Sequence, residues 1–377
     1  MDFNLSDEQQ MLRDAASRYV RERYGFESRR HLAAQGGPDS GHWAVYAEMG
    51  WLALAVPEAD GGLGCGFVET ALVAEELGRG LVLEPYIGCA VLASRLLERA
   101  DAPACAERRA QGLADLAAGS AQFALAHGEP DSRFELDAVG TTARAEGSGY
   151  VLDGTKLMVP AAATAGGFIV SARLDDGLDD GEVALFLVPR EAVTLHAYPL
   201  IGGTRAADVA LRGVFVPAEA RLSAPGSGPA LLDEALDRAA LAQVAEGLGC
   251  MEAVLAITND YLKTRQQFGQ PIGRFQALQH RMAEMFVDVQ ETRSILLRGI
   301  ASIDAEPAAR RRAVSAAKAM LGSAGRFVGG QGIQLHGGIG LTDEHPIGHY
   351  YKRLLVLEKL YGDSEWHLSR FIQAQPA

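Results

Sequence analysis

The sequence predicts an α+β multi-domain protein with an N-terminal helical domain, a central antiparallel β-barrel and a C-terminal four-helix bundle. Three observations support this fold class. Apolar residues recur at helical spacing in the first part of the chain, short β-like runs follow from near Ser120, and two long helical stripes begin after Pro229. The expected domain limits are residues 1–118, 119–226 and 227–377.

The N-terminal part opens with a helix start signal. Ser6 is a candidate N-cap and Gln9, three residues later, offers the partner of a capping box before the stretch 11–24. Residues 42–56 predict a second helix that ends at Pro57 and a glycine-rich turn. Apolar spacing predicts further helices over 68–80, 90–100 and 106–119.

In the middle of the chain the helical spacing of apolar residues gives way to short β-like runs. Gly, Pro and Asp residues separate its β-like runs, as is typical of short strands joined by turns. Their number and spacing predict a small antiparallel sheet or barrel. The runs are residues 121–127, 149–159, 166–174, 183–189 and 209–217.

The last part of the chain carries two long stripes of apolar residues at alternating spacings of three and four. Such stripes with short connections predict a helical bundle, and most of these side chains are expected in its core. The first stripe runs from Leu241 through Val244 and Leu248 to Leu262, and the second runs from Met282 to Ile303.

Composition narrows the class of protein. A net charge of −13, from 35 basic and 48 acidic residues, comes with no basic run, which argues against a nucleic-acid partner. The four cysteines are far apart, the histidines lack metal-ligand spacing, and the N-terminus is unlike a signal peptide. No apolar run of membrane-spanning length stands out. We therefore expect a soluble cytoplasmic protein without a metal site or a membrane span.

Two stretches in the C-terminal third are too particular to be explained by packing alone. They are "YLKTRQQFGQPIGRFQALQHRMAEM", residues 261–285, and "QGIQLHGGIGLTDEHP", residues 331–346. With "MGWLALAVPEADGGLG" and "GYVLDGTKLMVPAA" earlier in the chain, they resemble the acyl-CoA dehydrogenase family over the whole length.

The resemblance implies an FAD enzyme that oxidises an acyl-CoA thioester between C2 and C3. In the family a carboxylate removes the C2 proton, hydride leaves C3 for the flavin, and electrons pass to an electron-transferring flavoprotein. Members form homodimers or homotetramers. The chemistry suits these groups, because a weakly acidic C2 proton needs a polarised carbonyl and a desolvated carboxylate beside it.

The resemblance also implies cofactor-binding residues. An Arg-x-x-Phe pair and a Gln…Gly-Gly turn serve FAD bound mainly by the neighbouring subunit. An arginine and close backbone N–H groups suit a pyrophosphate. The alternative is that the arginine forms a surface ion pair and the glycines only turn the chain. The matching residues are Arg265, Phe268, Gln334, Gly337 and Gly338.

The flavin pocket of the middle domain departs from the family pattern. Met158 stands where the family has a tryptophan beside the flavin, and Ser364 matches a threonine near the base. Both remain candidate cofactor contacts. The other substituted positions are Gly128, Arg133, Phe134 and Pro160, where the family has threonine, glycine, serine and a hydroxyl residue.

The catalytic base of the family is also missing. Matching the family's "Tyr-Glu-Gly-Thr" stretch puts Gly362 at the glutamate position, and an ungapped count from Gln334 puts Tyr361 there. A second family location, on the first bundle helix, falls on Ala239, with Asp237 on about the opposite side of that helix. Asp363 is the candidate substitute, although it is displaced and shorter. Glu358 and Glu365 are expected to be solvated helix charges.

Three functions follow from this pattern. Residues that serve a neighbour's FAD are kept, while the chain's own flavin pocket and base are altered. The pattern favours a subunit of a heteromeric acyl-CoA dehydrogenase that completes the FAD site of a homologous catalytic chain. The alternatives are a homo-oligomeric dehydrogenase that uses Asp363 and a structural homologue that binds no flavin.

Overall fold

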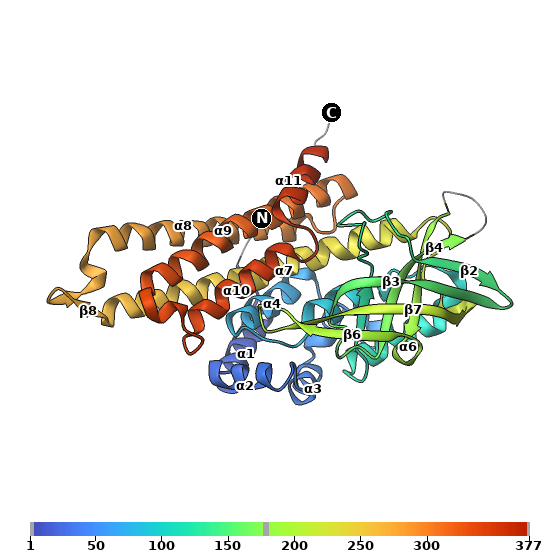
Figure 1. Ribbon diagram of the computed structural model, residues 1–377, viewed down its shortest axis with the longest axis horizontal. Coiled ribbons are helices and arrows are strands. Elements are labelled where there is room, and N and C mark those ends of the chain that lie inside the picture. Colours follow the sequence, from blue (N-terminus) through green and yellow to red (C-terminus); the bar gives the residue numbers. More distant parts are fainter. Residues whose placement is uncertain (1–3, 176–180, 375–377) are drawn as a thin grey trace.

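The computed structural model describes residues 4–175 and 181–374, and it is elongated, with the bundle at one end and the β-sheet at the other (Figure 1). The N-terminal helices lie beneath the bundle, beside α7. The helices of this first part are α1 (Asp7–Arg23), α2 (Phe26–Ala34), α3 (Ser40–Glu48), α4 (Phe67–Arg79), α5 (Ser94–Glu98) and α6 (Ala106–Ala117).

The capping box predicted at the start of α1 is confirmed. The Ser6 hydroxyl accepts from the Gln9 N–H at 3.2 Å, and the Gln9 side chain accepts from the Ser6 N–H at 3.0 Å. The single helix expected over 42–56 is wrong. The helix ends at Glu48, because Gly50 takes a left-handed φ of 74° and starts a separate 3₁₀ turn.

The middle part is a seven-stranded curled sheet in which β4 pairs with β5 on one side and with β1 and β2 on the other. The β1–β4 and β2–β4 pairs are parallel, so the sheet is mixed and not wholly antiparallel. Two of its strands, β2 and β6, are mostly exposed and polar, so they lack the apolar runs by which the other strands were predicted. The strands are β1 (Phe123–Ala126), β2 (Thr142–Glu146), β3 (Gly149–Pro160), β4 (Gly167–Asp175), β5 (Val183–Pro189), β6 (Thr194–Pro199) and β7 (Arg205–Pro217).

The C-terminal part is a bundle whose central helix, α9, packs against α7, α8, α10 and α11. Both predicted apolar stripes face its core. A short hairpin, β8 (Gln266–Gln267) and β9 (Gln270–Pro271), joins the first two long helices at the far end of the molecule from the sheet (Figure 1). The helices are α7 (Gly228–Thr264), α8 (Gln276–Ser302), α9 (Pro307–His336), α10 (Pro346–Lys359) and α11 (Ser364–Gln373).

The longest helix, α7, corrects the expectation that no stretch of the chain is long and apolar enough to cross a membrane. By length and composition α7 is apolar enough to cross a membrane, with a mean hydropathy of 1.5 over its most apolar window. However, 78% of that window is buried inside the protein. The helix contacts α4, α8, α9 and α10, so its apolar residues serve the core of the bundle.

Candidate functional site

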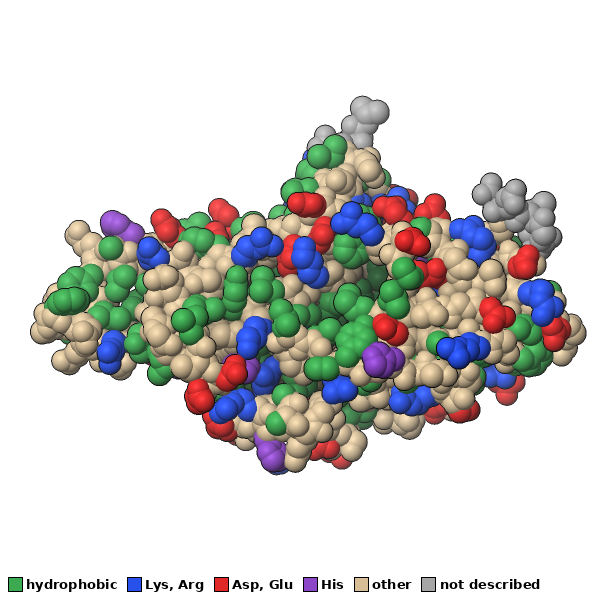
Figure 2. Space-filling model, in the orientation of Figure 1, with side chains coloured by type: hydrophobic (Ala, Val, Ile, Leu, Met, Phe, Trp, Pro, Cys, Tyr) green, Lys and Arg blue, Asp and Glu red, His purple; other side chains and the backbone are tan. Residues whose placement is uncertain are grey.

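Two cavities meet where the bundle, the N-terminal helices and the sheet come together. The Gln243 cavity is an open pocket of about 810 Å³, its mouth included, and is bounded by α4, α7 and the segments 82–88 and 160–164. The Met158 cavity is an open pocket of about 840 Å³, its mouth included, and lies between β3, the segment 127–136 and α11. Pro160, Leu360 and Tyr361 line both cavities and form the wall between them. On the face in Figure 2, hydrophobic side chains gather around a hollow between the bundle and the sheet.

The Met158 cavity brings together the sequence departures from the family's flavin pocket. All five substituted positions line it, although they come from two separate segments of the chain. The ring of Phe134 lies 5.8 Å from that of Trp366 on α11, centroid to centroid. The five positions are Gly128, Arg133, Phe134, Met158 and Pro160.

The side chains of this cavity do not fit an isoalloxazine ring. Such a ring carries several nitrogen and oxygen atoms that need hydrogen-bond partners when buried. The lining is mostly apolar, and two of its charged residues, Asp237 and Arg370, pair with each other at 2.6 Å. Phe134, Trp366 and Met158 present apolar surface instead. The chain therefore offers the flavin ring few of the contacts that the resemblance implies.

The two remaining flavin candidates on this side have other contacts. Met158 has a left-handed φ of 50°, is 44% exposed, and its N–H donates to Oδ1 of Asp208 at 3.0 Å. The hydroxyl of Ser364 packs against α9, where a Cβ added to Gly322 would lie 1.9 Å from it. Met158 thus stays at the cavity, whereas Ser364 faces the bundle.

The two positions that the sequence matches to the family's glutamate, Tyr361 and Gly362, form a strained turn. Tyr361 has a φ of 58° and Gly362 a φ of 105°, both in the left-handed region. A Cβ on Gly362 would lie 2.6 Å from Nε2 of His367 and 2.6 Å from Cε3 of Trp366. Only glycine fits there, so a glutamate at Gly362 is excluded by sterics as well as by sequence.

A buried lysine fixes this turn from the inside. Nζ of Lys318 donates to the carbonyl oxygens of Leu357 at 2.6 Å, Leu360 at 2.8 Å and Gly362 at 3.0 Å. These groups would otherwise be unpaired at the end of α10. The turn is therefore held in place, with the Tyr361 ring directed to the wall between the cavities. Burial, as the largest cause, raises the pKa of Tyr361 well above its usual range, so its hydroxyl stays protonated.

Asp363, the candidate base, caps α11 and lines neither cavity. Its Oδ1 accepts from the Trp366 N–H at 3.0 Å, and Oδ2 lies 3.5 Å from Nζ of Lys359. Burial disfavours the charged form of this carboxyl, but the Trp366 hydrogen bond and Lys359 outweigh it and hold its pKa below the usual range. Its role as the base stays a prediction, and these contacts weigh against it.

The other carboxylates near the family's base positions are also engaged. Asp237 is 2% exposed and accepts from Arg310 at 2.8 Å and from Arg370 at 2.6 Å. Ala239 is buried and lines neither described cavity. Glu365 is exposed, as expected, but Glu358 is only 5% exposed and pairs with Lys359 at 3.3 Å. The expectation of a solvated Glu358 is wrong, because α10 buries it against α9.

The residues expected to serve a neighbour's FAD lie at the other end of the bundle. Arg265, Phe268, Gln334, Gly337 and Gly338 are all exposed, and Phe268 is 89% exposed. The guanidinium of Arg265 has no hydrogen bond or ion pair to any described residue. An exposed, unpaired arginine at the same end of the bundle as an exposed glycine turn fits a phosphate group held by another chain. Their cofactor role stays a prediction.

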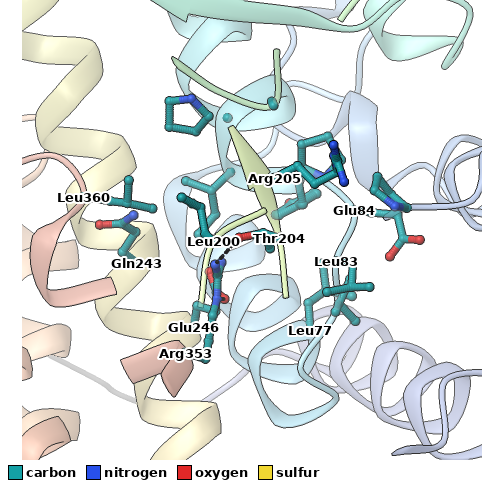
Figure 3. Close-up of a pocket in the computed structure, with 18 of the residues that line it drawn as sticks. Leu77, Leu83, Glu84, Leu200, Thr204, Arg205, Gln243, Glu246, Arg353 and Leu360 are labelled. Carbon is teal, nitrogen blue, oxygen red and sulfur yellow. Dashed lines mark hydrogen bonds and ion pairs between the residues drawn. The ribbon is translucent and has the colours of Figure 1, made fainter. Parts of the chain in front are cut away.

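The Gln243 cavity contains polar residues that the sequence reading missed. Gln243 and Glu246 lie one turn apart on α7, and Arg353 reaches them from α10 (Figure 3). Nε of Arg353 donates to the Glu246 carboxylate at 2.6 Å, which makes Glu246 a paired charge and not a free base. In the sequence, the polar residues Gln243 and Glu246 interrupt the apolar stretch of α7, and this interruption could have indicated a site.

Comparison with known proteins covers nearly the whole chain. Models of the acyl-CoA dehydrogenase N-terminal, middle and C-terminal domains match residues 6–119, 124–211 and 226–375. The acyl-CoA dehydrogenase IpdE2 of Mycobacterium tuberculosis is 32% identical over 92% of this chain and 91% of its own length.

Two solved assemblies share the fold. A chain of the ChsE4-ChsE5 complex from Mycobacterium tuberculosis is 28% identical, with a TM-score of 0.89 and full coverage of both chains. A chain of a variant Tcur3481-Tcur3483 steroid ACAD is 29% identical, with a TM-score of 0.86, covering 98% of this chain and 97% of that one.

Proposed function

This chain belongs to the acyl-CoA dehydrogenase family of FAD-dependent oxidoreductases acting on CH–CH groups, and we propose that it is the subunit of a heteromeric member that completes its partner's FAD site. The acyl-CoA substrate reacts in the partner. The assembled enzyme passes its electrons to an electron-transferring flavoprotein and works in the cytoplasm. The domain limits of 1–118, 119–226 and 227–377 are part of the same proposal.

One observation carries the proposal. The residues matched to the family's flavin contacts fall into two groups, one in which the family residues are replaced and one in which they are kept. Near the Met158 cavity the five family positions are replaced and the glutamate position admits only glycine. At the far end of the bundle, Arg265 and the Gly337–Gly338 turn are kept and exposed, and the Arg265 side chain has no partner among the described residues. In a homo-oligomer whose chains each bound FAD in the family manner, every chain would need both groups, one for its own FAD and one for its neighbour's.

The relatives support a two-component enzyme. Two of the structural matches are named as paired chains, ChsE4-ChsE5 and Tcur3481-Tcur3483, and the second is named a steroid ACAD. By analogy, the partner of this chain is a homologous subunit with a carboxylate base and an unaltered flavin pocket. Its FAD pyrophosphate would meet Arg265 across the interface.

What the chain's own residues do follows from their positions. The Arg265 guanidinium binds and orients a phosphate at the interface, and the exposed ring of Phe268 adds apolar contact beside it. FAD, when bound, supplies the hydride acceptor of the family reaction. The Gln243 cavity receives an acyl group, but the wall residue Tyr361 supplies no carboxylate to remove a proton from it.

The proposal is tested by the flavin absorbance of the purified protein. The chain should carry no stoichiometric flavin when expressed alone, and one flavin per pair when co-purified with a homologous subunit that carries the glutamate. Flavin at one per chain in the protein expressed alone, bleached anaerobically by an acyl-CoA, would refute it. Absence of flavin from the pair as well would favour a structural homologue.

A further inference from the structure

Arg29 on α2 is a buried cation that joins two segments of the Gln243 cavity wall. It is 2% exposed. Its Nη2 donates to the Gly202 carbonyl oxygen at 2.6 Å, and its Nε donates to that of Leu81 at 3.4 Å. Gly202 lies between β6 and β7, and Leu81 precedes the wall segment 82–88. Arg29 forms no ion pair with a carboxylate of the described residues, so neutral acceptors alone satisfy its buried charge.

The tip of the β6–β7 hairpin, residues 200–204, is packed on this guanidinium. Gly203 has a left-handed φ of 87°, and a Cβ there would clash with Nη2 of Arg29. Leu200 and Thr204 line the cavity (Figure 3). The Leu200 N–H donates to the Thr204 carbonyl oxygen at 2.8 Å, and the Gly203 N–H donates to that of Leu200 at 3.0 Å. A short hairpin is marginal by itself in water, so these two bonds depend on how the tip is packed.

The third partner of Arg29 is a histidine whose protonation state is fixed by the geometry. Nη1 of Arg29 lies 3.1 Å from Nδ1 of His349 on α10. Because a guanidinium has donors only, Nδ1 is the acceptor and carries no proton. Nε2 of the same ring then holds the proton and donates to the Asp343 carbonyl oxygen at 3.0 Å. The bond between Arg29 and His349 therefore exists only while the ring is neutral.

The charges that face His349 are mostly positive. Arg29 approaches from α2 and Lys352 lies on α10, whereas the Asp343 carboxylate, from the segment before α10, is 4.0 Å from Nε2. Burial, as the largest cause, and the charges of Arg29 and Lys352 hold the pKa of His349 below its usual range, although Asp343 acts against them. The further ionisable side chains around these residues are Tyr24, Arg30, Cys250, Tyr350 and Arg353.

We propose that Arg29 and His349 form a proton-operated latch, which holds the hairpin tip in the wall of the Gln243 cavity at neutral pH and releases it in acid. Protonation of Nδ1 turns the acceptor into a donor and places a second positive charge 3.1 Å from Nη1 of Arg29. The guanidinium is then repelled, and Gly202 loses its donor. The His349 side chain is 15% exposed, so its proton is exchanged with solvent. The latch acts on the cavity wall itself and does not depend on the proposed function.

The size of the acid response follows from the difference in proton binding between the two forms. A released imidazole has a pKa near 6.5, so at pH 5.5 it is protonated by about ten to one, whereas the latched ring does not take the second proton. The latched form therefore has its full advantage above pH 6.5 and loses it as the pH falls. The population of the released form should rise roughly tenfold between pH 7.5 and 5.5.

Hydrogen–deuterium exchange of the full-length chain, read by mass spectrometry on peptides that cover residues 200–205, measures this population. After division by the intrinsic exchange rate at each pH, the tip amides should exchange roughly tenfold faster at pH 5.5 than at pH 7.5. Peptides from α9 are the internal reference for global unfolding and should keep their corrected rates. Unchanged exchange at the tip, or an equal acceleration in α9, would overturn the latch.

Two variants connect the response to His349. His349→Gln keeps a side-chain acceptor for Arg29 but does not titrate, so it should fold and protect the tip equally at both pH values. His196→Gln is the matched control, since it removes an exposed histidine from β6, a few residues before the tip. It should keep the tenfold response. An acid response that survives in His349→Gln, or one that disappears in His196→Gln, would assign the switch to another group and refute the latch.

Discussion

The Cα of Gly362 faces the ring of His367 so closely that a Cβ would lie 2.6 Å from its Nε2 atom. The ring is itself fixed. Its Nε2 donates to the Tyr361 carbonyl oxygen at 3.1 Å, so Nδ1 accepts from the Ser315 hydroxyl at 3.2 Å. Burial, the largest cause, holds the pKa of His367 well below its usual range, and the ring stays neutral. The position matched to the family's glutamate in the sequence is thus enclosed by the buried ring of His367 and the half-buried ring of Trp366.

Substitution of Gly362 should therefore destabilise the protein without creating a base. Gly362→Ala should lower the free energy of unfolding by about 2–4 kcal/mol, from backbone strain together with a clash against two rings. Gly213→Ala is the control, because Gly213 has a φ of 61° but nothing within 4 Å of its Cβ position. It should cost about 1 kcal/mol, the backbone part alone. Equal losses of unfolding free energy for the two variants, measured by urea unfolding, would show that the His367 and Trp366 rings move aside at no cost.

Asp363 should behave as a helix cap and not as a base. Asp363→Asn keeps a side-chain acceptor for the Trp366 N–H, so its stability should stay within about 0.5 kcal/mol of the wild type, whereas Asp363→Ala should lose about 1 kcal/mol. The kcat of the assembled enzyme should be unchanged in Asp363→Asn. A loss of roughly a hundredfold or more in that variant, at normal stability, would instead identify Asp363 as the base.

Arg265 should matter to flavin retention but not to folding. Arg265→Ala removes an exposed, unpaired guanidinium, so the free energy of unfolding should change by less than about 0.5 kcal/mol. The flavin content of the co-purified pair should fall, measured as the ratio of flavin to protein absorbance after gel filtration. Lys263→Ala, two residues away and also exposed, is the matched control. Undiminished flavin in Arg265→Ala would contradict the interface role.

His127 should contribute to acid sensitivity. Burial, the largest cause, and the nearby charge of Lys156 lower the pKa of this histidine to about 4. The unfolded chain, with a pKa near 6.5, binds the proton more readily. The free energy of unfolding therefore carries the full benefit of a neutral, buried His127 above pH 6.5. This benefit is lost as the pH falls toward 4, by about 3 kcal/mol in all.

Urea unfolding at several pH values compares the wild type with His127→Gln. The variant should lose less stability than the wild type between pH 6.5 and 4, and the two curves should run parallel above pH 7. Curves that stay parallel down to pH 4 would show that the imidazole is already solvated in the folded protein.

The sequence by itself determined the order of the domains, the capping box of α1 and the stripes that α7 and α8 bury. These features depend on local spacing, since apolar periodicity and a capping pair act over a few residues. It also determined the family, because the motifs around Arg265 and Gly337 occur in a particular order along the chain.

The tertiary structure alone decided which residues share a site. Gly128 and Met158 meet at one cavity, and Gln243 faces another, because elements far apart in the sequence pack together. Parallel pairing of β1 with β4 and the burial of Glu358 likewise depend on contacts between distant segments, which leave no local pattern. The enclosure of Gly362 by the His367 and Trp366 rings is of this kind, since it depends on how the turn after α10 packs against the first turn of α11.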